Sequence, residues 1–263
     1  MRLNGMAATK KTILITGASA GFGKATAELF AANGWNIIIT GRRKVRLELL
    51  ERQLREKFGV NVLSLAFDVR NGADVKTVFS NLPAEWNSID VLVNNAGLAA
   101  GLAPVQEGSI DDWEQMIDTN VKGLLYVTRA VAPLMQSRKQ GHIVNIGSIA
   151  GKEVYANGNV YCATKHAVDA LTKAMRIDLL PHHIKVTQIA PGMAETEFSL
   201  VRFKGDEQRA KTVYAGLQPL TAEDIAETIF WVVSRPAHVN INDMVIMPAA
   251  QANSTTVNRH SQT

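Results

Sequence analysis

The chain has 263 residues, of which 46% are hydrophobic and 20% are charged, which suits one α/β domain over residues 1–263. No apolar run approaches the ~20 residues of a membrane span, and residues 1–11 lack the long apolar stretch of a signal peptide, so no membrane contact and a cytoplasmic location are expected. The net charge of +4 permits an anionic partner, but the basic residues are scattered, which argues against nucleic-acid binding. A single cysteine, Cys162, argues against disulfides, and six histidines without ligand spacing argue against a metal site.

Short β-branched runs alternate with helical patterns almost to the end of the chain, which predicts stacked βαβ units. The expected strands span residues 12–16, 35–40, 61–67, 89–93, 142–146, 184–189 and about 243–247. The expected helices span residues 21–33, 43–57, 72–81, 112–138, 159–180 and 222–235. Capping-box patterns open two of the helices, Ser109 with Asp112 and Thr221 with Asp224. Most strands are near-continuous apolar runs, which is typical of a parallel sheet with helices on both faces.

Two stretches lie outside this pattern. Residues 191–219 are long for a connection between a strand and a helix, and such loops are usually functional or mobile. We expect them to form a substrate loop. The tail from about 248 to 263 is polar, and its last ten residues are expected to be frayed or to take part in subunit contacts.

A glycine-rich turn at residues 16–23 joins the first strand to the first helix. Its spacing is GxxxGxG, which permits a tight turn and close approach of a pyrophosphate to the helix N-terminus. Glycines at such turns also serve packing alone, but the position after the first strand favours a dinucleotide site. The expected contacts are Gly17, Ser19, Ala20, Gly21, Phe22 and Gly23.

Arg42 and Arg43 follow the second strand, where an NAD-binding protein usually places a carboxylate for the ribose 2′-hydroxyl. Guanidinium groups at this position suit a 2′-phosphate, so the sequence favours NADP(H) as the cofactor. The alternative is that both arginines simply belong to the solvated start of a helix.

Polar residues also end the third and fourth strands. Asp68 suits either adenine recognition or the N-cap of the next helix. Asn94 and Asn95 suit cofactor contact or a structural tie between strand ends. Because ligands bind at the carboxyl ends of parallel strands, the cofactor site is expected to include a further group of residues. They are Asp68, Val69, Asn95, Ala96 and Gly97.

These motifs together resemble the short-chain dehydrogenase/reductase family. The matching elements, in family order, are TGxxxGxG at 16–23, NNAG at 94–97, Asn120, Ser148, YxxxK at 161–165 and Pro191-Gly192. The resemblance implies a Rossmann-type, doubly wound parallel sheet of about seven strands, and a homotetramer or homodimer built through the two long helices. It also implies that Asn120 lies in a local kink holding a water, and that Ser148 holds the substrate oxygen. Four further residues are expected at the nicotinamide end of the cofactor, namely Pro191, Gly192, Met193 and Thr196.

More narrowly, the chain is similar to NADP-dependent 3-hydroxy acid dehydrogenases that oxidise L-allo-threonine and L-serine, some of which reduce malonic semialdehyde. Segments outside the general motifs carry this similarity, namely 82–86, 113–120, 196–198, 201–206 and 236–242. The alternatives are a related reductase of a keto-acyl, sugar or xenobiotic carbonyl, and an NADP-binding regulator without turnover. An intact set of four catalytic residues (Asn120, Ser148, Tyr161 and Lys165) argues against the regulator.

Tyr161 and Lys165 lie one helical turn apart, and this spacing predicts acid–base chemistry. Lowering a tyrosine pKa from ~10 to ~7 requires a relative stabilisation of the phenolate by roughly 4 kcal/mol. One ammonium at ~4 Å, in an effective dielectric of ~20, supplies about that much. The Tyr161 hydroxyl is therefore expected to exchange the proton, and Lys165 is expected to lower its pKa and to bind the nicotinamide ribose.

A small carboxylic acid substrate needs a cation. Arg202, in the loop of residues 191–219, is the first candidate, against the alternative of a surface arginine. Lys152 is a weaker candidate.

Overall fold

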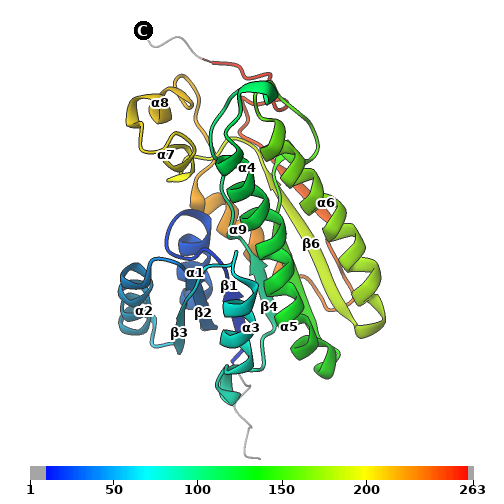
Figure 1. The fold of residues 1–263 in the computed structure, drawn as a ribbon. Coiled ribbons are helices and arrows are strands. Elements are labelled where there is room, and N and C mark those ends of the chain that lie inside the picture. The colour runs from blue at the N-terminus through cyan, green and yellow to red at the C-terminus, as the bar shows by residue number, and fades with distance from the viewer. Residues whose placement is uncertain (1–9, 260–263) are drawn as a thin grey trace, which may run out of the picture.

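A computed structural model of the chain describes residues 10–259, and the parts of the predictions that fall on residues 1–9 and 260–263 lie outside it. Seven strands form one parallel sheet in the order β3-β2-β1-β4-β5-β6-β7 (Figure 1). The predicted doubly wound sheet is therefore confirmed. The strands are β1 (Thr12–Ile15), β2 (Asn36–Gly41), β3 (Val62–Ala66), β4 (Val91–Asn94), β5 (Gly141–Ile146), β6 (Ile184–Pro191) and β7 (Asp243–Ile246).

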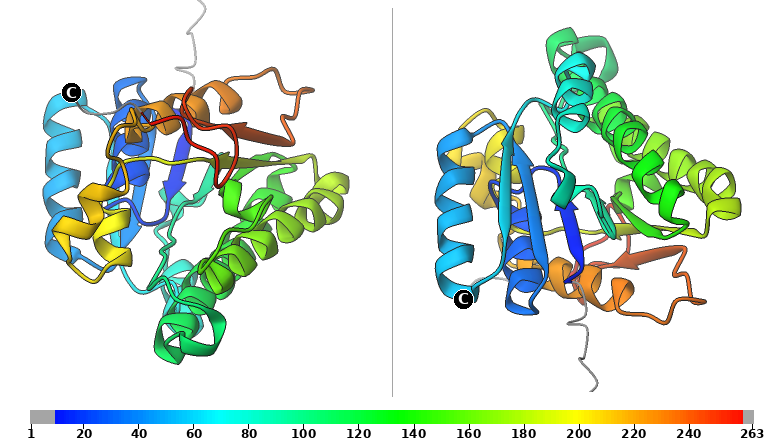
Figure 2. Two further views of the ribbon diagram at one scale, coloured as in Figure 1. Left: turned by 90° about the horizontal axis from the view of Figure 1, so that it is seen from above. Right: turned by 90° about the horizontal axis from the view of Figure 1, so that it is seen from below.

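Helices cover both faces of the sheet, as the two further views in Figure 2 show. One face carries α1 (Gly21–Ala32), α2 (Lys44–Phe58) and α9 (Ala222–Val233), and the other carries α3 (Gly72–Ser80), α5 (Leu124–Arg138) and α6 (Asn159–Leu179). No helix within residues 10–259 is long and apolar enough to cross a membrane.

Strand β1 shows why the sequence folds into these layers. Successive side chains of a strand point to opposite faces of the sheet. Ile13 and Ile15 pack in the core with α1, α2 and α9, whereas Leu14 packs in the core with α3, α5 and α6. All three side chains are fully buried, which explains the continuous apolar run that the sequence shows.

The strand order reverses between β1 and β4, and this position determines where a ligand can bind. Chain connections from these two strands leave in opposite directions, so a crevice opens beyond their carboxyl ends. The glycine turn follows β1 and the segment 95–97 follows β4, so both border this crevice.

The predicted helix over residues 112–138 is interrupted. Helix α4 (Ile110–Ile117) passes into a π-helical segment (Asp118–Gly123) before α5 begins. The periodicity of apolar residues continues through the segment, which is why the sequence gives one long helical pattern. The extra residue per turn shifts the helix face there, and π-segments are frequent at functional sites.

The structure adds detail to the loop at 191–219 and corrects two smaller expectations. The loop at 191–219 contains two short helices, α7 (Phe198–Arg202) and α8 (Glu207–Thr212). The tail is not frayed as far as residue 259, because its backbone and the guanidinium of Arg259 bond to neighbouring segments of the chain. The capping box is complete only at Thr221, because the carboxylate of Asp112 pairs with Lys204 Nζ at 3.0 Å.

His142 on β5 predicts how stability depends on pH. Burial, assisted by the charge of Lys185, lowers the pKa of the His142 imidazole from 6.5 to about 3. Between about pH 3 and 6.5 the unfolded chain therefore binds a proton that the folded chain excludes. This contribution to the free energy of unfolding is fully present above pH 6.5 and is lost as the pH falls. At pH ~5 the loss is about 2 kcal/mol relative to pH values above 6.5.

We expect His142→Gln to remove most of this pH dependence from the free energy of unfolding, measured with urea at pH ~7 and ~5. The exposed His238→Gln is the matched control and should keep the parental slope. An identical slope in His142→Gln and the parent would show that His142 does not cause it.

Candidate active site

The glycine turn after β1 is a close backbone contact between two strand ends. Gly17 has a φ of +67°, and a Cβ there would lie 2.9 Å from Ala96 Cα, so neither the conformation nor the space accepts a side chain. A Cβ on Gly23 would lie 2.6 Å from Asn95 Nδ2. The turn therefore lies directly against the segment that follows β4.

Asn95 and Thr16 hold this contact in place. Asn95 Nδ2 donates to the carbonyls of Thr16 (2.8 Å) and Gly17 (3.3 Å). Thr16 Oγ1 accepts from the backbone N–H groups of Asn95 and Ala96 at 3.0 and 2.9 Å. Asn94, by contrast, is buried and donates to Asn145 Oδ1, so its contacts in the structure are those of the structural tie between strands.

The helix that follows the turn begins without a side-chain cap. Ala20 is the N-cap residue of α1, and the first turn contains no acidic side chain. The free N–H groups at this end, with the positive end of the helix dipole, suit an anionic group.

Arg43 closes the other side of the turn. Its Nε and Nη2 donate to Ser19 Oγ at 3.0 and 2.9 Å, and its Nη1 donates to Glu197 Oε2 at 2.8 Å. The Glu197 carboxylate also accepts two bonds from Arg46 Nη1, at 2.8 and 3.1 Å. Arg42 lies more loosely, 3.9 Å from Asp68 Oδ2. Arg42 and Arg43, at the end of β2, therefore face the crevice, and Arg43 is paired with Glu197, a carboxylate of the same chain.

Asp68 does not cap a helix, so that alternative is wrong. Asn71 is the N-cap residue of α3, and its side chain accepts from two backbone N–H groups. The Asp68 carboxylate instead receives Arg70 Nε and Nη2, the latter at 2.7 Å. This pairing fixes the carboxylate at the edge of the crevice.

Tyr161 and Lys165 lie one turn apart on α6, as the sequence predicts, and both are buried, at 8% and 7% exposure. Lys165 Nζ donates to the Ile146 carbonyl at 2.9 Å and lies 5.9 Å from the centre of the Tyr161 ring. Ser148, directly after β5, accepts from Ala150 N–H at 3.1 Å and so caps a short helical turn. The cap does not remove Ser148 from the site, because it lines the same cavity as Tyr161 and Lys165.

Burial dominates the protonation of both groups. It raises the pKa of the Tyr161 phenol, against the Arg202 guanidinium and the Ser148 hydroxyl, which lower it. Burial also lowers the pKa of Lys165 to about 8. Without a cofactor the phenol is thus protonated at neutral pH, and Arg202 is the cation that most lowers its pKa.

Asn120 lies in the π-helical segment rather than in the cavity. Its Oδ1 accepts from Leu98 N–H at 2.9 Å, and its Nδ2 donates to the Leu98 carbonyl and to Thr164 Oγ1 at 2.8 and 3.0 Å. A Cβ on Gly97 would lie 3.3 Å from Asn120 Oδ1 and 3.6 Å from Lys165 Nζ. The side chain therefore lies directly behind the Gly97–Lys165 region, and the local kink coincides with the π-helical segment.

Arg202, at the end of α7, reaches over the ring of Tyr161. Its guanidinium carbon lies 4.9 Å from the centre of the Tyr161 ring and 5.2 Å from that of Phe198, and its Nη2 donates to the Tyr155 hydroxyl at 2.8 Å. Its Nε is buried without a hydrogen-bond partner among residues 10–259. Lys152, in contrast, pairs with the carboxylates of Asp169 and Asp243.

One cavity of about 480 Å³ brings most of the predicted residues together. Gly23 and Asn120 are absent from its lining and lie behind it. The predicted residues that line it are Gly17, Ser19, Ala20, Gly21, Phe22, Arg42, Arg43, Asp68, Val69, Asn95, Ala96, Gly97, Ser148, Tyr161, Lys165, Pro191, Gly192, Met193, Thr196 and Arg202.

Several residues of the cavity carry no recognisable motif in the sequence. Tyr155, Tyr214, Gln251 and Ser254 also line it. Gln251 Oε1 accepts from Met193 N–H at 2.8 Å, so the C-terminal tail supports the strand end beside the site. No motif marks these residues, and only their position in the loops before α6 and after β6 and β7 was a usable signal.

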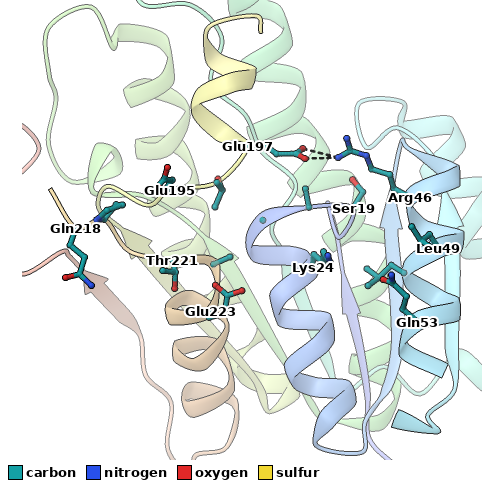
Figure 3. Close-up of a pocket in the computed structure, with 16 residues that line it drawn as sticks. Ser19, Lys24, Arg46, Leu49, Gln53, Glu195, Glu197, Gln218, Thr221 and Glu223 are labelled. Atoms are coloured by element: carbon teal, nitrogen blue, oxygen red, sulfur yellow. Dashed lines mark hydrogen bonds and ion pairs between the residues drawn. The ribbon is translucent and has the colours of Figure 1, made fainter. Parts of the chain in front are cut away.

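A second hollow, of about 860 Å³, lies beside the glycine turn (Figure 3). It opens between α2 and the start of α9. The residues it shares with the cavity are Ser19, Ala20, Gly21, Thr196 and Glu197. Its lining includes both acidic and basic side chains. Within the described part of the chain, no group of three or more His, Cys, Asp or Glu side chains is arranged to hold a metal ion.

The chain belongs to the short-chain dehydrogenase family, whose profile matches residues 11–206, and is therefore an oxidoreductase. The NADP-dependent 3-hydroxy acid dehydrogenase of Salmonella typhi is 52% identical over 241 residues, which cover 91% of this chain and 96% of that protein. The serine 3-dehydrogenase of Rhizobium radiobacter is 45% identical over 92% of this chain and 95% of its own. A closed form of serine dehydrogenase complexed with NADP+ superposes with a TM-score of 0.88, at 48% identity over 95% of this chain and 100% of that one. The family resemblance predicted from the motifs is confirmed, and so is the narrower similarity predicted from segments outside them.

Proposed function

We propose that the protein is an NADP(H)-dependent dehydrogenase of small 3-hydroxy acids or hydroxy amino acids, the class of L-allo-threonine, L-serine and 3-hydroxypropionate or malonic semialdehyde. One observation carries the proposal: a single cavity holds the glycine turn, the buried Tyr161 and the partly unpaired Arg202 guanidinium. The names of the relatives in Salmonella and Rhizobium support the same substrate class.

The residues present fit NADP(H). A side chain at Gly17 would fill the space beside Ala96, and the uncapped start of α1 offers N–H groups to the pyrophosphate. Arg43, already held by Ser19, is the group we assign to the 2′-phosphate, with Arg42 as a second cation. Asp68 would hold the adenine, and the segment 191–193 with Thr196 would border the nicotinamide. When bound, the cofactor gives or takes a hydride at the nicotinamide ring.

The protein's own residues would transfer the proton of the substrate hydroxyl and orient the substrate. The Tyr161 hydroxyl would exchange the proton of the substrate oxygen, and Ser148 would hold that oxygen beside it. Arg202 lowers the pKa of the Tyr161 phenol, and Lys165, whose Nζ lies 5.9 Å from the ring centre, would be a second cation favouring the phenolate. Asn120 would fix the position of Lys165 from behind, through its hydrogen bond to Thr164 Oγ1, on the residue before Lys165.

Arg202 is the group we assign to the substrate carboxylate. It is a cation surrounded by three aromatic rings, it forms no ion pair with a carboxylate of the described chain, and its Nε has no partner. A carboxylate can accept from that Nε and from an Nη while the hydroxyl-bearing carbon lies near Tyr161. In this arrangement one cavity would hold both the carboxylate of the substrate and its reacting carbon.

We also propose that residues 1–263 form one catalytic domain and that the protein is cytoplasmic and a homotetramer or homodimer. Exposed apolar side chains on or beside the two long helices support an assembly. Leu125 on α5 is 38% exposed, and Ile177 and Leu180 at the end of α6 are 73% and 70% exposed.

The test is a screen of NADPH formation with L-serine, the threonine diastereomers and 3-hydroxypropionate, each with NADP+ and with NAD+. We expect turnover of several of these acids and a clear preference for NADP+. Reduction of bulky neutral ketones without any oxidation of hydroxy acids would contradict the substrate class. Equal rates with NAD+ would contradict the role of Arg43.

A further inference from the structure

The ion pairs of Glu197 lie where the cofactor's distinguishing group is expected to bind. Glu197 Oε2 accepts from Arg43 Nη1 at 2.8 Å, and its two oxygens accept from Arg46 Nη1 at 2.8 and 3.1 Å. In Figure 3, Glu197 reaches from its loop toward Arg46, close to Ser19 of the glycine turn. A carboxylate of this chain therefore contacts the same guanidinium that we assign to the 2′-phosphate.

We propose that Glu197 is a specificity-determining residue that competes with the 2′-phosphate of NADP(H) for Arg43. The proposal rests on the function proposed above, because it requires that Arg43 binds this phosphate. Glu197 thereby sets how strongly the protein prefers a cofactor with the phosphate over one without it.

Charge balance explains why such a carboxylate is present. Arg42, Arg43 and Arg46 lie within five residues, and two of them converge on one point at the edge of the glycine turn. Like charges at this distance repel, and the single Glu197 carboxylate neutralises part of that repulsion when no other anion is bound. A phosphate carries nearly two negative charges at neutral pH, so it repels the carboxylate while it attracts Arg43.

The geometry also shows how the exchange of partners can occur without disrupting the loop. Arg46 makes two contacts to the Glu197 carboxylate, whereas Arg43 makes one and is held independently by Ser19. Arg43 can therefore lose Glu197 and remain in place beside the turn. Arg46 keeps the carboxylate when Arg43 turns its Nη1 to the phosphate.

Glu197→Gln tests the competition, because it keeps the shape of the side chain and removes its charge. The probes are 2′,5′-ADP, which carries the 2′-phosphate, and 5′-ADP, which lacks it, and the readout is the Kd from calorimetry. We expect the Kd of 2′,5′-ADP to be at least about threefold lower for Glu197→Gln than for the parent. The Kd of 5′-ADP should be nearly the same for both proteins. Glu197→Asp, which keeps the charge, should stay close to the parent.

Glu195→Gln is the matched control. The Glu195 carboxylate is exposed, lies in the same loop and lines the same hollow, but it forms no ion pair within residues 10–259. It should leave both dissociation constants near the parental values. If it tightens 2′,5′-ADP binding as much as Glu197→Gln does, net charge alone is responsible and the proposal fails. Weaker or unchanged 2′,5′-ADP binding in Glu197→Gln overturns it as well.

Arg43→Gln separates this proposal from the one it rests on. If Arg43→Gln loses the preference for 2′,5′-ADP while Glu197→Gln has no effect, only the competition is wrong. If Arg43→Gln keeps the preference, the assignment of the phosphate site itself is wrong. When both hold, adding Glu197→Gln to Arg43→Gln should have no further effect, because the shared guanidinium is gone.

Discussion

Tyr161→Phe is expected to lower kcat by about 10²- to 10⁴-fold, the usual contribution of a positioned general acid–base group. The substitution removes the hydroxyl and keeps the ring, which packs edge-on against Phe198 with ring centres 5.6 Å apart. Packing is therefore preserved while the proton-exchanging group is lost. The measurement is kcat with a 3-hydroxy acid and NADP+, together with the Kd of NADP+, which should change little.

Tyr126→Phe provides the matched control. Tyr126, on α5, packs over Gly72 at the start of α3 and does not line the cavity, so its loss of a hydroxyl should leave kcat at the parental value. Parental turnover by Tyr161→Phe would remove the proposed mechanism. A fall in kcat accompanied by an equal loss of NADP+ binding would instead indicate a damaged site.

Arg202→Gln is expected to raise KM for hydroxy acids by about 10- to 100-fold, because a carboxylate in a largely buried site loses its charge-assisted hydrogen bonds. The effect should be confined to substrates with a carboxylate. A neutral carbonyl compound should keep its KM. The pH profile of its kcat/KM should nevertheless move to higher pH, because Arg202 lowers the pKa of Tyr161 and its removal leaves the phenol less acidic.

Lys152→Gln distinguishes the two candidate cations. Because Lys152 already pairs with two carboxylates, we expect its replacement to leave KM for hydroxy acids nearly unchanged. A rise in KM for hydroxy acids in Lys152→Gln, with none in Arg202→Gln, would reverse the assignment of the carboxylate site. Arg202→Lys should lie between the parent and Arg202→Gln, since an ammonium keeps the charge but loses the fork of donors.

The sheet was predictable from the sequence because most strands are near-continuous apolar runs bounded by turn residues. Strand ends differ by only one or two residues, as at β4, which begins at Val91 rather than at 89. The π-helical segment was not predictable in its backbone form, because a single inserted residue hardly changes the apolar pattern over 112–138. Only the family resemblance indicated an irregularity at Asn120.

The candidate site was predictable where motifs mark it and not where the chain folds back. The glycine turn, Tyr161 and Lys165 follow from local spacing. Glu197 and Arg46 lie 151 positions apart, and Gln251 meets Met193 across 58 positions, so nothing local connects them. Contacts of this kind depend on how loops close over the sheet, and a single sequence carries little information about that.

Transfer of an isotope from substrate to cofactor tests the central claim most directly. L-serine, or whichever 3-hydroxy acid reacts fastest in the screen, is labelled with deuterium on its hydroxyl-bearing carbon and incubated with the protein and NADP+. We predict that the reduced cofactor gains one deuterium in the mass spectrum and that Tyr161→Phe forms this deuterated cofactor about 10²- to 10⁴-fold more slowly. Reduced cofactor that carries no deuterium, or no reduced cofactor with any 3-hydroxy acid, would contradict the account.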